Sequence, residues 1–219
     1  MDKLGLIAGA GNLPVEVARE CLHSGRPLFV VRLKGLTDPQ LESYPGCEVG
    51  IGELGKAIKA LKKAGCVSVC MTGVVQRPDF SNLAMDLRGI SILPRLALEA
   101  RKGDDAILRT LVHEFEKEGF RVEGAQEVAG HLALAAGALG RISPSEGHHE
   151  DIAKAPKPIQ ERRMDLPTIG LATVHRAAKA GLAGIVGEAG GLIVLDRDTV
   201  IAEADALGLF IYGVSPDEA

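Results

Sequence analysis

Residues 154–170 (KAPKPIQERRMDLPTIG) bring together the residue types that phosphate chemistry requires. The stretch carries four cationic side chains, Lys154, Lys157, Arg162 and Arg163. Asp165 follows them and stands shortly before Thr168, the predicted N-cap of a helix. A carboxylate between guanidinium groups and a helix start could hold a metal ion that binds a phosphate. The alternative, which composition alone favours, is a solvated linker in which Asp165 only caps the helix.

A glycine turn at residues 9–14 (GAGNLP) is a second candidate site, suited to binding an anion. It joins a predicted strand at 3–8 to a predicted helix that ends near Gly25, and helix starts offer free N–H groups to phosphates. The dinucleotide fingerprint is incomplete, because Pro14 stands where the third glycine should be and the next predicted strand lacks the acidic residue that binds a ribose. A nicotinamide-dependent oxidoreductase is therefore disfavoured. A purely structural tight turn at Gly11 remains an alternative.

Thr72 and Gly73 form a third candidate site, because they follow the predicted strand 67–71. In doubly wound sheets, ligands bind beyond the carboxyl ends of the strands. If strand 67–71 is the neighbour of the first strand, Thr72 and Gly73 lie near Gly11. The two glycine-containing turns would then line one crevice.

These candidate sites must be positioned by alternating strands and helices. Apolar periodicity predicts strands at 3–8, 28–33, 48–52, 67–71, 90–93 and 121–125, and helices at 13–25, at 53–64 and from 103, the last capped by Asp104. The alternation predicts an α/β fold, with a Rossmann-like doubly wound N-terminal domain at 1–137. A shift to Gly, Ser, Pro and charge then predicts a linker at 138–164. A smaller α/β C-terminal domain is expected at 165–219, opening with a helix at 169–180.

Composition and charge limit the classes of function. The 219 residues are 46% apolar and carry a net charge of −4, so the chain as a whole has no general attraction to nucleic acid or anionic lipid. Any phosphate site must come from local clustering of cations. The four cysteines show neither CxxC nor zinc spacing and are predicted to be buried thiols. No apolar run approaches a membrane span and no signal peptide is recognisable, so the expected location is the cytoplasm.

Several segments occur in one order along the chain and carry a resemblance to a known family. They are LGLIAGAGNLP, YPGCEVGIGELGK, TGVVQRPDF, RKGDDA, EKEGFRVEGA, APKPIQERRMDLPTIG and the C-terminal AGLAGIVGEAGGLIVLDRDTVIAEADALGLFIYGV. Together they resemble the UDP-2,3-diacylglucosamine pyrophosphatases of lipid A biosynthesis, in the two-domain family that is unrelated to calcineurin-like phosphoesterases. The likeness covers nearly the whole chain except about 142–153.

The resemblance implies an activity and a set of site residues. The activity is hydrolysis of the pyrophosphate bond of UDP-2,3-diacylglucosamine to UMP and lipid X (2,3-diacylglucosamine 1-phosphate), assisted by Mg²⁺ or another divalent cation. Asp165 matches the family's catalytic aspartate and is the implied metal ligand. The implied substrate-binding residues are Gly11, Asn12, Thr72, Gly73, Gly124 and Lys157. Further expectations are no nucleic-acid partner, a transient contact with the inner membrane surface, and a homodimer.

One departure from the family concerns the region near residues 151–154. Family members carry an additional segment between the linker and APKPIQ, whereas this chain passes directly across. The missing part would form much of the core of the second domain and some of the substrate site. A non-catalytic nucleotide- or lipid-binding remnant of the family is therefore the alternative to an active enzyme.

Overall fold

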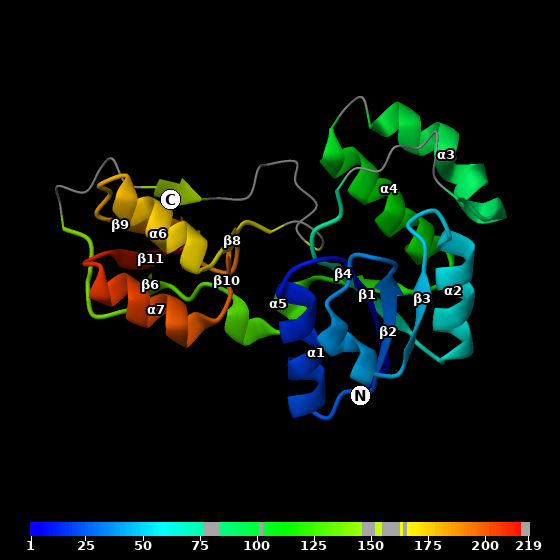
Figure 1. Cartoon of the computed structure of the whole chain (residues 1–219), viewed down its shortest axis with the longest axis horizontal. Coiled ribbons are helices and arrows are strands. Elements are labelled where there is room, and N and C mark those ends of the chain that lie inside the picture. The colour runs from blue at the N-terminus through cyan, green and yellow to red at the C-terminus, as the bar shows by residue number, and fades with distance from the viewer. Residues whose placement is uncertain (77–83, 101–102, 146–151, 155–162, 164–165, 216–219) are drawn as a thin grey trace. The chain divides into compact units, whose positions relative to one another are not determined.

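The computed structural model describes residues 1–76, 84–100, 103–145, 152–154, 163 and 166–215 (Figure 1). The chain forms two compact units, which are Met1–Ala129 with Arg163–Asp165, and Gly130–Arg162 with Leu166–Ala219. The division along the chain falls between Ala129 and Gly130, whereas the shift in composition placed the first boundary after residue 137. Among the described residues, no helix is long and apolar enough to cross a membrane.

The first unit is built on a five-stranded parallel sheet. Its strands are β1 (Leu4–Ala8), β2 (Leu28–Leu33), β3 (Gly46–Val49), β4 (Ser68–Thr72) and β5 (Arg121–Glu123), and they are ordered β3-β2-β1-β4-β5. The chain thus builds outward from β1 to one side and then continues from β4 to the other, which is the order of a Rossmann half. The predicted α/β fold with a doubly wound N-terminal domain is confirmed.

Helices cover both faces of this sheet (Figure 1). Apolar side chains of α2 (Leu54–Lys63) and α4 (Asp104–Lys117) form one buried cluster with β2–β5. Helix α1 (Leu13–His23) and the short α5 (Ala125–Val128) contact each other and the sheet. Buried apolar residues on both faces explain why the strands read as continuous apolar runs. At Gly5, a Cβ atom would lie 2.2 Å from Leu61 Cδ2, so a larger residue there would require the Leu61 side chain of α2 to shift.

Helix α3 (Leu87–Glu99) corrects the predicted strand at 90–93. The Asp86 side chain caps it by accepting a hydrogen bond of 2.8 Å from the Gly89 amide. The periodicity of a short apolar run followed by Pro94 is compatible with either a strand or a helix segment. The helix forms here because of the Asp86 cap and the packing against α4 and α2. The predicted cap of α4 is also wrong, because Gly103 holds the N-cap position and Asp104 is the first helical residue.

The second unit contains two small sheets and two longer helices among its described residues. One sheet has the order β6-β11-β9-β7, formed by β6 (Gly137–Ala138), β11 (Phe210–Val214), β9 (Gly184–Glu188) and β7 (Ile152–Lys154). The other pairs β10 (Ile193–Val194) with β8 (Thr168–Ile169). Helices α6 (Leu171–Lys179) and α7 (Arg197–Ala206) share a buried apolar cluster with these strands. Thr168 therefore lies in a strand, and Gly170, not Thr168, occupies the N-cap of α6.

Candidate active site

The strand order of the first unit reverses between β1 and β4, and a parallel sheet offers its ligand crevice at the carboxyl ends of two such strands. The two strands pair directly, with Ala8 opposite Thr72. The condition under which Thr72 and Gly73 lie near Gly11 is therefore met, and the turns that follow the two strands share one edge. Thr37 adds the loop after β2, because its hydroxyl contacts the Ala8 carbonyl and accepts a 2.8 Å hydrogen bond from the Leu33 amide.

Backbone hydrogen bonds continue past the ends of β1 and β4 and join the two turns. The Gly9 amide donates to the Thr72 carbonyl at 2.9 Å. Ala10 and Val74 then exchange a pair of hydrogen bonds at 2.9 and 2.8 Å, as an antiparallel bridge. Gly73 has φ +95°, and a Cβ there would lie 2.8 Å from the backbone of Gly9. The close approach of the two turns thus requires glycine at this position on both conformational and steric grounds.

Gly11 and Asn12 form the exposed rim of this edge. Gly11 has φ +91°, and the space where a Cβ would point is open for at least 4 Å. Asn12 is the N-cap residue of α1, and its side chain makes no capping hydrogen bond. The positive end of the helix dipole is therefore open to solvent or to an anion beside the glycine turn. These features make Gly11 and Asn12 available to a ligand, and their role as substrate contacts stays a prediction.

Thr72 supplies a buried hydroxyl at the end of β4. The residue is 7% exposed, and no hydrogen-bond partner for its Oγ1 atom occurs among the described residues. Leaving a buried hydroxyl unpaired costs about 1–3 kcal/mol, so such a group is uncommon in a native fold. A ligand oxygen or a bound water at this edge would satisfy it.

Gly124, at the end of β5, differs from the other predicted substrate-binding residues in the environment of its backbone amide. Its amide donates to the Glu127 carboxylate, so this donor already has a partner within the protein. A Cβ at Gly124 would fall 2.4 Å from the Gln126 side chain. A larger residue here would require the Gln126 side chain to shift, and any contact of Gly124 with substrate would use its carbonyl or its lack of a side chain.

Asp165 and Lys157 lie outside the described residues, so their geometry does not enter the site. Within the part of the chain that the structure describes, no group of three His, Cys, Asp or Glu side chains could hold a metal ion. A Mg²⁺ ion needs only one or two protein carboxylates and keeps several waters. The described edge is compatible with such an ion through the unpaired Thr72 hydroxyl, a group that can face a metal-bound water or a phosphate oxygen.

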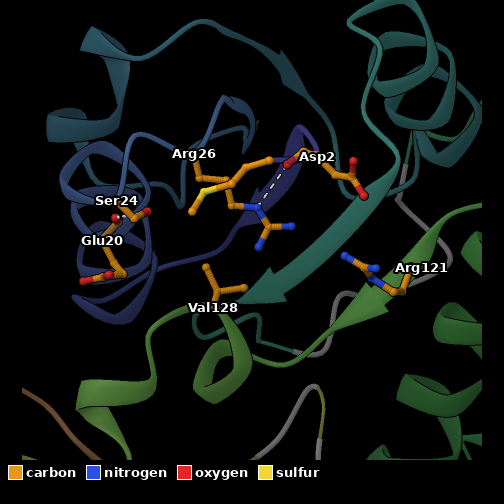
Figure 2. Close-up of a pocket in the computed structure, with 7 residues that line it drawn as sticks. Asp2, Glu20, Ser24, Arg26, Arg121 and Val128 are labelled. Carbon is orange, nitrogen blue, oxygen red and sulfur yellow. Dashed lines mark hydrogen bonds between the residues drawn. The ribbon is translucent and has the colours of Figure 1, made fainter.

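A second polar region, around the amino ends of β1, β2 and β4, was not predicted from the sequence, and it includes Glu123, the last residue of the short β5. Arg26, before β2, binds both carboxylate oxygens of Glu123 at 2.8 and 2.9 Å and donates to the Ser68 hydroxyl at 2.9 Å. Its Nε also donates to the Asp2 carbonyl, the contact dashed in Figure 2. A cavity of about 320 Å³ opens here, and it is lined by Met1, Asp2, Glu20, Ser24, Arg26, Arg121 and Val128.

Electrostatics show that this amino-edge region is a paired charge cluster. The hydrogen bonds from Arg26, with further ones from Arg121 and Ser68, lower the pKa of Glu123 to about 2 against the opposing effect of burial. The pKa of Arg26 is raised, chiefly by its hydrogen bonds to Glu123. Nearby, burial raises the pKa of the Cys21 thiol to about 11, so it is not a ready nucleophile at neutral pH. No local sequence signal could reveal the Arg26–Glu123 pair, because 97 positions separate its members.

Comparisons with known proteins identify the family to which the chain is similar. One family model, described as the LpxI N-terminal domain, matches residues 3–132, and another, described as the LpxI C-terminal domain, matches residues 94–212. UDP-2,3-diacylglucosamine pyrophosphatase LpxI from Caulobacter vibrioides is 49% identical over 278 aligned positions, covering 100% of this chain and 99% of the relative. The alignment is longer than the 219 residues of this chain, so the chain lacks positions that the relative has.

Among solved structures, CobK precorrin-6A reductase is similar with a TM-score of 0.36 and 11% sequence identity. The match covers 98% of this chain and 88% of that one. A likeness of this size carries no argument about function.

Proposed function

This chain belongs to the LpxI family, and from that membership we propose that it hydrolyses the pyrophosphate bond of UDP-2,3-diacylglucosamine in lipid A biosynthesis. The observation that carries the proposal is the 49% identity to the Caulobacter enzyme across the whole of this chain. The described geometry supports it independently, because the carboxyl edge of the first unit has the open helix start and glycine turns of a phosphate-binding crevice.

The products of this reaction would be UMP and lipid X. A water attacks one phosphorus in line while the charge on the other oxygens is neutralised. We assign the nucleotide half to the edge formed by Gly11, Asn12, Thr72 and Gly73. There the Thr72 hydroxyl would donate to a phosphate oxygen, and the α1 start would stabilise the negative charge. Gly124 and Lys157 complete the proposed contacts, Lys157 as a cation for the diphosphate.

Mg²⁺ is the proposed cofactor, with Asp165 as its protein ligand. When bound, such an ion neutralises charge on the diphosphate and lowers the pKa of a bound water. The Asp165 carboxylate would either hold the ion or orient the water for attack, and both roles need its negative charge. A single carboxylate is sufficient for Mg²⁺, because the ion completes its shell with waters and substrate oxygens.

A second candidate function is supported by the alignment with the Caulobacter enzyme, because this chain lacks positions that the relative has. A chain without part of its second domain could retain nucleotide or lipid binding and lose turnover. In that case the carboxyl edge of the first unit would bind UMP, and no hydrolysis would follow.

We further propose a cytoplasmic location and a homodimer. The proposed location follows from the nucleotide substrate. Sedimentation of the purified chain would give the number of copies in the assembly.

A hydrolysis assay on UDP-2,3-diacylglucosamine, with UMP as the measured product, separates the two functions. An active enzyme releases UMP in proportion to time and loses this activity when EDTA removes the divalent cation. Titration of UMP in a calorimeter provides the second measurement. Binding of UMP without any turnover would support the remnant, whereas neither turnover nor binding would exclude both functions.

A further inference from the structure

Helix α3 presents an apolar stripe that no described part of the chain covers. Leu87, Ile90 and Leu98 are 87%, 54% and 56% exposed. Pro94 and Ala97, also exposed, lie between them at helical spacing, so these five residues share one face. The opposite face carries the buried Gly89 and Ile92, and the helix packs against α4 and α2. The stripe is therefore additional apolar surface and is not needed to hold α3 on its unit.

Cations outnumber acids in the sequence of this segment, and one of them, Arg88, is paired with Glu114 and Glu118. The segment 87–102 contains Arg88, Arg95, Arg101 and Lys102 against a single acid, Glu99. This local excess of cations contrasts with the net charge of −4 for the whole chain. Arg95 is half exposed and lies 3.8 Å from Glu114, a distance at the outer limit of an ion pair. Its guanidinium can therefore reach an external anion at little cost.

The combination of an apolar face and flanking cations indicates what kind of partner binds this face of α3. Two copies of this chain meeting through α3 would bring two basic segments together, which is unfavourable. A helix with Leu and Ile on one face and Arg beside it is instead typical of helices that lie in the interface of an anionic bilayer. Val74 and Val75, in the turn that follows β4, are exposed as well, so further apolar surface follows the candidate site along the chain.

We propose that α3 docks this protein on anionic phospholipid membranes, with the stripe of Leu87, Ile90, Pro94, Ala97 and Leu98 in the headgroup and acyl boundary and Arg95 among the headgroups. Docking through this helix gives the expected membrane contact a defined surface. Its benefit to catalysis rests on the proposed function, because a diacylated substrate is delivered from a lipid surface. The docking itself does not depend on turnover.

Flotation with vesicles tests the proposal without any hydrolysis. The wild type is expected to float with vesicles made of equal amounts of phosphatidylglycerol and phosphatidylcholine. Replacing the stripe in Leu87→Ser, Ile90→Ser and Leu98→Ser together should lower the bound fraction about tenfold or more. The matched control replaces three exposed apolar residues elsewhere, as Leu22→Ser, Val67→Ser and Leu207→Ser, and should bind as the wild type does. Circular dichroism melts confirm that both variants are folded.

Charge gives a second, independent measurement. Arg95→Glu should weaken binding to the mixed vesicles several-fold, and added salt should weaken binding of the wild type. Equal binding by the wild type and the stripe variant overturns the proposal. So does a stripe variant that changes from dimer to monomer in sedimentation while the wild type ignores vesicles, because the stripe would then join two copies. Turnover of detergent-dispersed substrate should be unchanged in the stripe variant, so a failure of docking and a failure of the proposed activity are separately visible.

Discussion

The two ends of the parallel sheet in the first unit are both polar but differ in how their polar groups are satisfied. At the amino ends, Arg26 uses all of its nitrogens on Glu123, Ser68 and the Asp2 carbonyl, beside a sizeable cavity (Figure 2). At the carboxyl ends, the Thr72 hydroxyl is buried without a partner among the described residues, and the start of α1 has no side-chain cap. The first end is electrostatically complete, and the second lacks partners that a ligand could supply.

The two ends of the sheet are therefore expected to have different roles. A protein that leaves donors unpaired accepts a cost in stability, and binding energy can offset that cost. Arg26 and Glu123 instead satisfy each other, and removing either partner would leave a buried charge unpaired, at a cost in stability. The amino-edge region should therefore control stability and the carboxyl edge should control function, and mutations can separate the two.

The largest effect is expected for Asp165→Asn. The substitution keeps the size of the side chain and removes its charge, so kcat should fall by about a thousandfold while the thermal midpoint stays close to that of the wild type. Turnover of UDP-2,3-diacylglucosamine and a calorimetric melt measure the two quantities. Glu161→Gln, which neutralises another carboxylate of the same stretch, is the control and should retain activity. Near-normal turnover by Asp165→Asn would remove this residue from the mechanism.

Arg26→Met tests the opposite end of the sheet. The variant leaves the buried Glu123 carboxylate without its bidentate partner, and breaking such a pair costs about 3–5 kcal/mol. The free energy of unfolding from urea titration should fall by that amount, while binding of UMP to the folded protein should not change. Arg121→Met is the control, because this exposed arginine contacts the same carboxylate and its loss should cost much less. A large loss of UMP affinity in folded Arg26→Met would mean that the two ends are coupled.

Acid should weaken the amino-edge region in a defined range of pH. The Glu123 pKa is about 2 in the folded protein and about 4.5 when the chain is unfolded. A lowered folded pKa stabilises the fold above the unfolded value, and this stabilisation is lost as the pH falls from about 4.5 to about 2. The contribution at neutral pH is about 3 kcal/mol by linkage. Urea titrations across this range should show a shallower acid dependence in Glu123→Gln than in the wild type, and parallel curves would contradict the assignment.

Thr72→Val is expected to have the smallest effects. Its effect on stability should be neutral or favourable, whereas its effect on UMP affinity should be unfavourable. Removing an unpaired buried hydroxyl should leave stability unchanged or raise it by up to about 1 kcal/mol. The affinity for UMP should fall about tenfold if the hydroxyl donates to a phosphate oxygen. Thermal melts and calorimetric titration on the same samples give both values. Unchanged affinity for UMP would mean that the phosphates bind away from the end of β4, whether or not the stability changes. Gly11→Val is a less clear probe, because the φ of +91° at Gly11 would strain valine in the absence of any ligand.

Much of the fold of the first unit could be predicted because local pattern and global position agree there. Strands β1, β2 and β4 are short apolar runs between turn residues, and the sheet buries both of their faces. The adjacency of β1 and β4 was left open by the sequence as a condition, and the pairing of the two strands answers it. Prediction failed at residues 90–93, where three apolar residues and Ser91 fit a strand or a buried helix equally well. The Asp86 cap that decides between them is recognisable only once a helix is present.

The candidate site was predictable only in the groups that local sequence controls. A glycine-containing turn at the end of a strand indicates that another group approaches the backbone closely, so Gly11 and Gly73 could be predicted from the sequence. The unpaired state of the Thr72 hydroxyl could not, because it depends on every neighbour that packs around the end of β4. The Arg26–Glu123 pair was missed for a related reason, since each residue alone looks like ordinary surface charge.

The bridge between Ala10 and Val74 has a consequence for motion. Because these amides bond to each other beyond the last paired residues of the sheet, the two turns cannot move apart unless the bridge between them breaks. Their amide protons should therefore exchange with deuterated solvent slowly, at rates close to those of β1 and β4 and unlike those of ordinary surface turns. An approaching ligand would meet a surface already in its final shape, and little of its affinity would be spent on ordering the backbone.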